Sequence, residues 1–271
     1  MILSKIAEYT RQRVEQSKSK TSIKELMTNI NDEKANIKAT IKSRNTQPYT
    51  FETALRKKED IAFICEVKKA SPSKGIISED FPFLEIGMDY ENAGADAISV
   101  LTEPEFFMGK DTYLTKISNA VNIPVLRKDF IIDEYQIYEG KVIGADAVLL
   151  ICSLLDTNTL KRFLTICNEL GISALVEAHN KEEIYSAIEA GSRIIGVNNR
   201  DLKTFEIDIN NSIYLRGLVP KDIIFVAESG IKTKKDINAL REAGVNAVLI
   251  GESLMRSNDK KHMLDTLRGL A

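Results

Sequence analysis

The chain has 271 residues, of which 44% are hydrophobic and 28% charged, as is ordinary for a globular protein. Its 37 basic and 39 acidic residues nearly cancel, so the composition gives no electrostatic reason to expect binding to nucleic acid or to a membrane surface. No stretch approaches the roughly 20 apolar residues that cross a bilayer, and the first residues lack the apolar core of a signal peptide.

The first fifty or so residues predict helices and no strand. Ile2, Ile6 and Val14 recur at helical intervals among charged residues, and a second helical segment runs from Ile23 to Met27. We interpret residues 1–50, which contain no glycine, as a polar helical extension.

From residue 61 onward, short apolar runs alternate with amphipathic stretches. Continuous apolar runs are typical of strands that are buried on both faces, as in a parallel sheet covered by helices. The eight runs span residues 61–68, 97–102, 123–128, 147–152, 173–178, 193–198, 223–229 and 247–253.

A repeated junction precedes every second run. The segments NAGADAISV, VIGADAVLL, EAGSRIIGV and EAGVNAVLI each end a predicted helix with glycine and then enter a strand. Eight such units predict a (β/α)8 TIM barrel over residues 61–271, which forms a single domain with the extension. A doubly wound open sheet is the alternative, and the barrel is favoured because no GxGxxG opens the first helix.

Polar residues collect where the predicted strands end, which is the active-site end of such a barrel. A buried, unpaired charge costs several kcal/mol, so we expect these side chains to face a shared, partly wet pocket. The strand ends present Glu66 and Lys68, Thr102 and Glu103, Lys128, Cys152, Glu177, Asn198 and Arg200, Ser229 and Gly230, and Gly251 to Ser253.

The last two strand ends predict a phosphate site. The motifs AESGI and IGESLM place small residues where a strand turns into a helix, and these two loops are the usual phosphate seat of the fold. Backbone N–H groups of Gly230, Gly251 and Glu252 are expected to point at the anion.

The ionisable strand ends suit proton transfer. A carboxylate in a partly dry pocket can have its pKa raised toward neutrality, and a lysine beside another cation can have its pKa lowered. Lys128 lies in VLRKDF with Arg127 on the opposite face of the strand, which leaves Lys128 inward and alone.

Cysteine and histidine are scarce. Cys65, Cys152 and Cys167 are an odd number without CxxC spacing, which predicts free thiols in a reducing compartment. His179 and His262 are too far apart to share a helical face, which argues against a histidine-based metal site. We therefore expect a cytoplasmic protein without a bound metal.

Several motifs together resemble the indole-3-glycerol phosphate synthase family of tryptophan biosynthesis. The resemblance covers essentially the whole chain, including the first helix, ILSKIAEYTRQRVEQSK. The remaining motifs are CEVKKASPSKG, IPVLRKDFIIDEYQIYE, LVEAH, GVNNRDLKTFEID, VAESGI and IGESLMR.

The resemblance implies a carboxy-lyase. Its substrate is 1-(2-carboxyphenylamino)-1-deoxyribulose 5-phosphate, which is closed into indole-3-glycerol phosphate with loss of carbon dioxide and water. No metal and no organic cofactor is implied. The implied partner is this small phosphorylated molecule, and the implied oligomeric state is a monomer with at most weak association with other tryptophan-pathway enzymes.

The resemblance also implies roles for individual residues. Lys128 would protonate the ribulose carbonyl as the aromatic carbon attacks it, because the developing alkoxide needs a positioned proton donor. Lys68 would assist dehydration, while Glu66 and Glu177 would hold the lysines and act as acid or base. The rest of the substrate would be oriented by Asn198, Arg200 and Ser71, its aromatic ring would be lined by Phe107, and its phosphate would be held by Ser229, Gly230, Gly251, Glu252 and Ser253.

Two other functions remain open at this point. One is a related phosphosugar barrel enzyme, such as an isomerase or an aldolase that forms a Schiff base through lysine. The other is a non-catalytic barrel that binds a phosphorylated ligand. Borohydride trapping would reveal the aldolase, and tolerance of a substitution at Lys128 would favour the binding protein.

Overall fold

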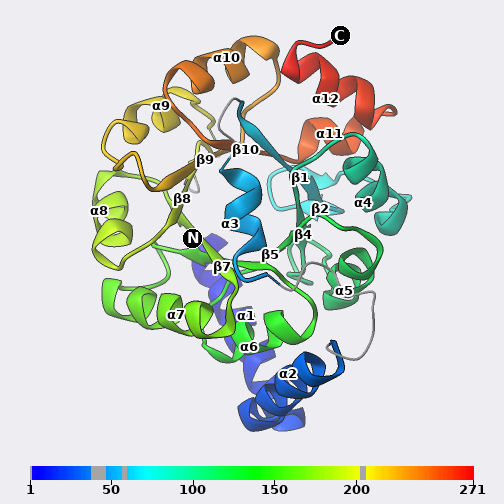
Figure 1. Cartoon of the computed structure of the whole chain (residues 1–271), viewed down its shortest axis with the longest axis vertical. Coiled ribbons are helices and arrows are strands. Elements are labelled where there is room, and N and C mark those ends of the chain that lie inside the picture. The colour runs from blue at the N-terminus through cyan, green and yellow to red at the C-terminus, as the bar shows by residue number, and fades with distance from the viewer. Residues whose placement is uncertain (1, 38–46, 57–59, 202–205) are drawn as a thin grey trace.

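The eight apolar runs form the eight parallel strands of a closed barrel in the computed structural model, which describes residues 2–37, 47–56, 60–201 and 206–271 (Figure 1). The strands neighbour one another in the order β1-β10-β9-β8-β7-β6-β5-β4, and every pair is parallel. Their bounds are β1 (Ala62–Val67), β4 (Ala97–Leu101), β5 (Val125–Lys128), β6 (Ala147–Ile151), β7 (Ser173–Ala178), β8 (Ile194–Asn198), β9 (Ile224–Glu228) and β10 (Ala247–Ile250). The predicted barrel is confirmed.

The strands are apolar throughout because both of their faces are buried. Alternate side chains point into the barrel, and the intervening ones pack against the surrounding helices. The inward apolar side chains form one core of their own: Ala62, Ile64, Ala97, Leu126, Ala147, Leu149, Ile151, Leu175, Ile194, Ile224, Val226, Ala247 and Leu249.

Helices surround the barrel, as Figure 1 shows. Gly94, Gly144, Gly191 and Gly244 have φ between 79° and 93°, so each of the four repeated junctions uses the left-handed conformation that favours glycine. The helices are α4 (Phe83–Asn92), α5 (Asp111–Ala120), α6 (Tyr135–Val142), α7 (Thr157–Leu170), α8 (Lys181–Glu189), α9 (Asn210–Arg216), α10 (Lys234–Glu242), α11 (Glu252–Arg256) and α12 (Lys260–Arg268).

The extension is helical, as predicted, and its parts lie at different places on the barrel. It comprises α1 (Ile2–Lys20), α2 (Ile23–Ile37) and α3 (Thr50–Leu55), so the second helix runs well past Met27. Residues 38–46 lie outside the described residues. Phe51 and Leu55 of α3 join the inner core at the end where the strands begin.

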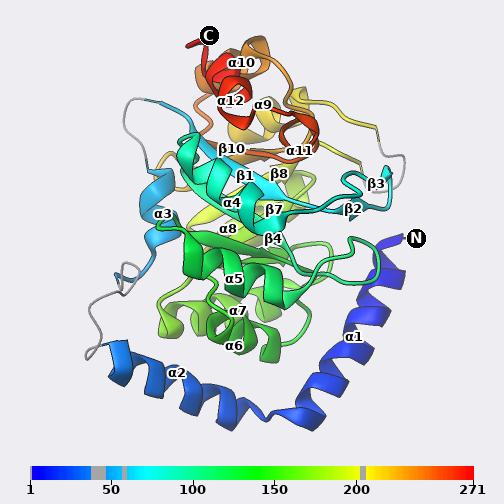
Figure 2. The ribbon, with the colours of Figure 1, turned by 90° about the vertical axis from the view of Figure 1, so that its right-hand side faces the viewer.

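The helix α1 lies near the opposite end of the barrel (Figure 2). There it is close to a hairpin of β2 (Ala70–Ser71) and β3 (Gly75–Ile76), which belongs to the loop after β1. Among the described residues, no helix combines the length and apolar character needed to span a membrane.

All the predicted strand runs except 173–178 are shorter in the structure, and the ends of the last two bear on the site. The strand β9 ends at Glu228 because Ser229 has φ of 67°, and β10 ends at Ile250 because Gly251 begins α11. Both changes release backbone at the end of the barrel where polar residues collect.

Candidate active site

All thirteen predicted site residues line one cavity at the ends of the barrel strands. The cavity has a volume of about 340 Å³. Residues from β1 and the loop after it, from the loop after β4, from β5, and from the last four strands and the segments that follow them therefore meet at one place. They are Glu66, Lys68, Ser71, Phe107, Lys128, Glu177, Asn198, Arg200, Ser229, Gly230, Gly251, Glu252 and Ser253.

Lys128 points into this cavity, but the prediction that it stands alone there is wrong. Its Nζ lies 2.9 Å from Glu177 Oε2 and 3.0 Å from Glu228 Oε2. Inward side chains from β5, β7 and β9 meet because each occupies the last inward position of its strand. Lys128 is thus an ammonium group held between two carboxylates.

The charges of this cluster shift one another's pKa values in opposite directions. Burial would lower the pKa of Lys128, but the carboxylates of Glu177 and Glu228 outweigh it and raise that pKa above its ordinary value. Burial would raise the pKa of Glu177, but the positive charges on Lys128 and His179 hold it well below its ordinary value. A lowered lysine pKa, one of the two routes considered for proton transfer, is therefore wrong for Lys128.

Glu228 was missed by the sequence reasoning. The alternation in IFVAE was sufficient to find it, because Glu228 continues the inward face of Ile224 and Val226. Burial and the carboxylate of Glu177 raise the pKa of Glu228 to about 7, against the effect of Lys128. Its Oε1 is buried and has no hydrogen-bond partner among the described residues. This atom faces the backbone of β8, where a Cβ at Gly196 would clash with it.

Glu66 and Lys68 form a second ion pair at the wall of the cavity. Lys68 Nζ donates to Glu66 Oε1. A Cβ at Gly251 would lie 2.5 Å from that oxygen and 3.0 Å from Lys68 Nζ, so a larger residue there would displace the charged ends of the pair. The Glu66–Lys68 pair at the end of β1 therefore packs closely against Gly251, which precedes α11.

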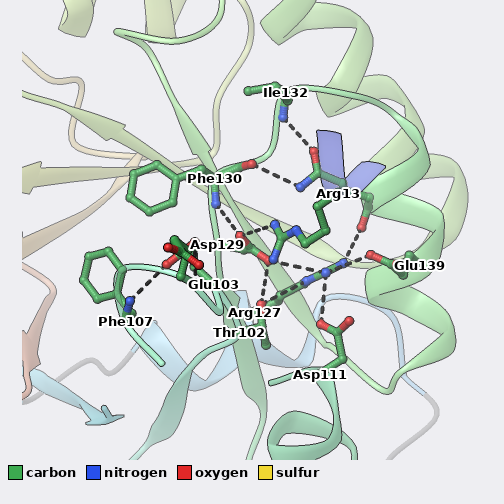
Figure 3. A network of polar contacts seen from close by, with 12 residues as sticks. Arg13, Thr102, Glu103, Phe107, Asp111, Arg127, Asp129, Phe130, Ile132 and Glu139 are labelled. Carbon is green, nitrogen blue, oxygen red and sulfur yellow. Dashed lines mark hydrogen bonds and ion pairs between the residues drawn. The ribbon is translucent and has the colours of Figure 1, made fainter. Parts of the chain in front are cut away.

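The aromatic part of the cavity lies between two loops and α1. The ring centroids of Phe107 and Phe130 are 5.9 Å apart, and Ile2 and Ile6 of α1 also line the cavity. The carboxylate of Glu103 accepts hydrogen bonds from the backbone N–H groups of three successive residues, among them Phe107 at 3.0 Å (Figure 3). Phe130 and α1 were also missed, because no local pattern shows that they turn toward the cavity.

Three polar strand ends do not line the cavity, contrary to expectation. Glu103 is used to hold the Phe107 loop. Thr102 donates to Asp129 Oδ2 at 2.7 Å, behind β5. Cys152 is half-buried, and its Sγ lies 3.6 Å from the carbonyl oxygen of Glu183. These side chains turn sideways or outward from their strands.

The phosphate motifs lie together at one end of the cavity. Ser229 and Gly230 both have positive φ, 67° and 83°, and they line the same wall as the start of α11. Lys232 and Arg256 add positive charge nearby. The arrangement offers backbone donors and cations to an anion.

A dense polar network lies on the outer side of β5 (Figure 3). Arg127, with 1% of its side chain exposed, contacts Asp111 at 3.1 Å, Glu139 at 2.8 Å and Asp129 at 3.4 Å. Arg13 of α1 contacts Asp129 Oδ1 at 2.7 Å. This network ties the extension to the strand that carries Lys128.

The described residues contain no group of three or more His, Cys, Asp or Glu side chains suited to hold a metal ion. Cys65, Cys152 and Cys167 are free thiols.

Sequence comparison identifies close relatives. The family described as "Indole-3-glycerol phosphate synthase" matches residues 3–267. A curated protein of that name from Ruminiclostridium cellulolyticum is 59% identical over 271 residues, covering 100% of both chains. Another of that name, from Endomicrobium trichonymphae, is 57% identical over 99% of this chain and 100% of its own.

Structure comparison finds more distant barrels. A 3-hexulose-6-phosphate synthase superposes with a TM-score of 0.62 at 15% identity, covering 78% of this chain and 99% of its own. KGPDC from Streptococcus mutans superposes with a TM-score of 0.61 at 11% identity, covering 78% of this chain and 97% of its own. At these identities the likeness shows the barrel fold alone.

Proposed function

Because the chain belongs to the indole-3-glycerol phosphate synthase family, we propose that the cavity of about 340 Å³ is its active site and that the residues lining it divide the steps of the reaction. The reaction closes 1-(2-carboxyphenylamino)-1-deoxyribulose 5-phosphate into indole-3-glycerol phosphate and releases carbon dioxide and water. The observation that carries the proposal is the placement of Lys128 between two carboxylates inside this cavity.

Lys128 is the proton donor for ring closure. Attack of the aromatic carbon on the ribulose carbonyl moves negative charge onto oxygen, and a fixed ammonium beside that oxygen stabilises it without reorganising solvent. Glu177 and Glu228 keep Lys128 charged before the substrate arrives. Their hold on two sides of Nζ also directs its remaining N–H bond toward the cavity.

The later steps need a base and an acid that exchange a proton near neutral pH. Glu228 suits this role because its pKa lies near 7 and it lines the cavity. Lys68, paired with Glu66, donates a proton to the departing hydroxyl, and Glu177 acts with them. No metal or organic cofactor takes part in this scheme.

The remaining groups bind and orient the substrate. Phe107 and Phe130 contact the aromatic ring, while Ser71, Asn198 and Arg200 hold the hydroxyl and carboxylate groups. The phosphate occupies the opposite end. Fixing the substrate at both ends folds the flexible sugar toward the geometry of ring closure. The residues at the phosphate end are Ser229, Gly230, Gly251, Glu252 and Ser253.

Purified protein mixed with the substrate tests the proposal directly. Indole fluorescence should rise with wild-type protein and should be nearly lost with Lys128→Met, while the affinity for inorganic phosphate stays the same. Borohydride added with substrate should trap no adduct, since an adduct would indicate a Schiff-base aldolase. Wild-type turnover retained in Lys128→Met would remove Lys128 from the mechanism.

We also propose that the chain works as a monomer in the cytoplasm, with at most weak contact to other tryptophan-pathway enzymes. The free thiols of Cys65, Cys152 and Cys167 support a reducing compartment. Sedimentation at micromolar concentration should give a single species of about 30.3 kDa, and a species of twice that mass would contradict it.

A further inference from the structure

His179 lies directly behind the catalytic cluster and outside the cavity. It follows Glu177 by two residues at the end of β7, so both side chains lie on the same side of the chain. His179 Nε2 is 3.4 Å from Glu177 Oε1, a contact between charges in which Nε2 forms no hydrogen bond among the described residues, whereas Lys128 donates to the other oxygen, Oε2. The carboxylate of Glu177 therefore lies between Lys128 and the imidazole of His179.

The second imidazole nitrogen contacts Glu183 at the start of α8. His179 Nδ1 lies 3.0 Å from Glu183 Oε2, and the backbone N–H of His179 donates to the same oxygen at 2.8 Å. Asn180 caps α8 by accepting from the backbone N–H of Glu183 at 2.9 Å, and its Nδ2 donates to Glu183 Oε1 at 3.2 Å. The helix start thus fixes Glu183, and Glu183 fixes the imidazole ring.

The charges around His179 favour its protonated form. Burial lowers its pKa, but Glu177 on β7 and Glu183 on α8 outweigh it and raise that pKa to about 10. From α9, the neutral amide of Asn211 donates to the carbonyl oxygen of His179 at 3.2 Å. The row Lys128, Glu177, His179 and Glu183 therefore alternates in sign from the cavity to an open groove that His179 and Glu183 line.

We propose that His179 is a positioning residue for the reaction: as an imidazolium bridging Glu177 and Glu183, it holds the Glu177 carboxylate against Lys128. The proposal rests on the proposed role of Glu177. It acts through Glu177, since His179 does not line the cavity itself. Without this cation, the carboxylate of Glu177 would be free to rotate its Oε1 away from its present position and to weaken its contact with Lys128.

The first test measures the charge of His179 without any turnover. The chain has two histidines, so ¹⁵N-histidine NMR of the full-length protein gives two titrating side chains, and His262→Gln assigns them. We expect the His179 imidazole to stay protonated at pH 8.5 and to lose its proton near pH 10. In Glu183→Gln the same loss should occur at lower pH. Loss of the proton below pH 7 in the wild type would overturn the proposal.

The second test compares turnover of His179→Gln with that of the matched control His262→Gln, which changes an exposed histidine on α12. At pH 7.5 we expect kcat to fall about tenfold in His179→Gln and KM to stay within about twofold, as when an outer hydrogen-bonding partner of an active group is removed. The ratio of wild-type to variant kcat should then shrink above pH 10, where the wild-type imidazole loses its charge.

A role limited to folding would give a ratio that does not change with pH, and an unchanged kcat would likewise contradict the proposal. Glu177→Gln, measured alongside, distinguishes a failure of the proposed role of Glu177 from a failure of the proposed role of His179. If that variant keeps full activity, the proposed role of Glu177 fails, whereas the NMR titration still reports whether the alternating charges exist. If Glu177→Gln loses activity and His179→Gln does not, only the positioning role of His179 fails.

Discussion

Arg127 and Lys128 are neighbours in the chain, and each is a buried cation among carboxylates. The two sites differ in whether a cavity adjoins the cation. The guanidinium of Arg127 is enclosed: besides its three carboxylates, it donates to the carbonyl oxygen of Gln136 at 2.9 Å and to Thr102 Oγ1 at 3.3 Å. Lys128 borders a cavity, and beside it Glu228 Oε1 has no partner among the described residues.

The difference indicates what each site does. A buried ion pair contributes to stability when every group in it is satisfied, and its cost appears when one partner is removed. A buried cluster that keeps an unsatisfied group beside a cavity has perturbed pKa values available for chemistry. We therefore propose that the outer side of β5 stabilises the barrel, while its inner side takes part in the reaction.

Removing the enclosed cation should have the largest effect. In Arg127→Met, Asp111, Asp129 and Glu139 lose their common partner, so the free energy of unfolding should fall by about 3–5 kcal/mol. Urea denaturation measures it. Lys128→Met also leaves two buried carboxylates without their cation, so it should lose stability too, but Arg127→Met should keep the turnover of the protein that remains folded. A loss below about 1 kcal/mol in Arg127→Met would contradict the structural role of the outer face.

Removing the inner cation should mainly affect turnover. In Lys128→Met, kcat should fall by at least about a hundredfold, because a positioned proton donor is lost. Far-UV circular dichroism should match that of the wild type. A kcat near the wild-type value would show that the open site is not the reacting one.

Glu228→Gln should change how stability depends on pH. The pKa of Glu228 is raised from 4.5 to about 7 on folding, so the wild-type protein loses stability as the pH rises through that interval. The glutamine variant has no proton to lose there. The difference between its free energy of unfolding and that of the wild type should therefore rise in favour of the variant from pH 4.5 to pH 7. Urea denaturation at several pH values measures it, and parallel curves would contradict the raised pKa.

Arg13→Met should have the smallest effect. Its side chain is 25% exposed, and its partner Asp129 keeps hydrogen bonds from Thr102 and from the backbone N–H of Phe130. We expect the free energy of unfolding to fall by about 1 kcal/mol, the usual contribution of one such contact.

We also propose that the extension and the barrel form a single domain, so thermal unfolding of the wild-type protein should be one transition. Two separate transitions would contradict that.

Much of the site was readable from the strand ends alone. Side chains alternate along a strand and parallel strands end at one side of a barrel, so Glu66, Lys128 and Glu177 could be placed together before any coordinates were known. Glu228 obeys the same rule and was overlooked in favour of the next residue, Ser229. By contrast, no strand rule reaches Phe130 or Ile6, whose positions depend on how a loop and α1 fold back over the cavity.

The sequence by itself determined the eight strands, the junction glycines and the inward face of each strand, because these follow from local backbone preferences and a period of two. Only the tertiary structure decided which charges touch. The pairing of Lys128 with Glu177 and Glu228, and of Asp129 with Arg13, joins residues 49, 100 and 116 positions apart. Such contacts depend on barrel closure and on the docking of α1, which bring together segments that no local pattern relates.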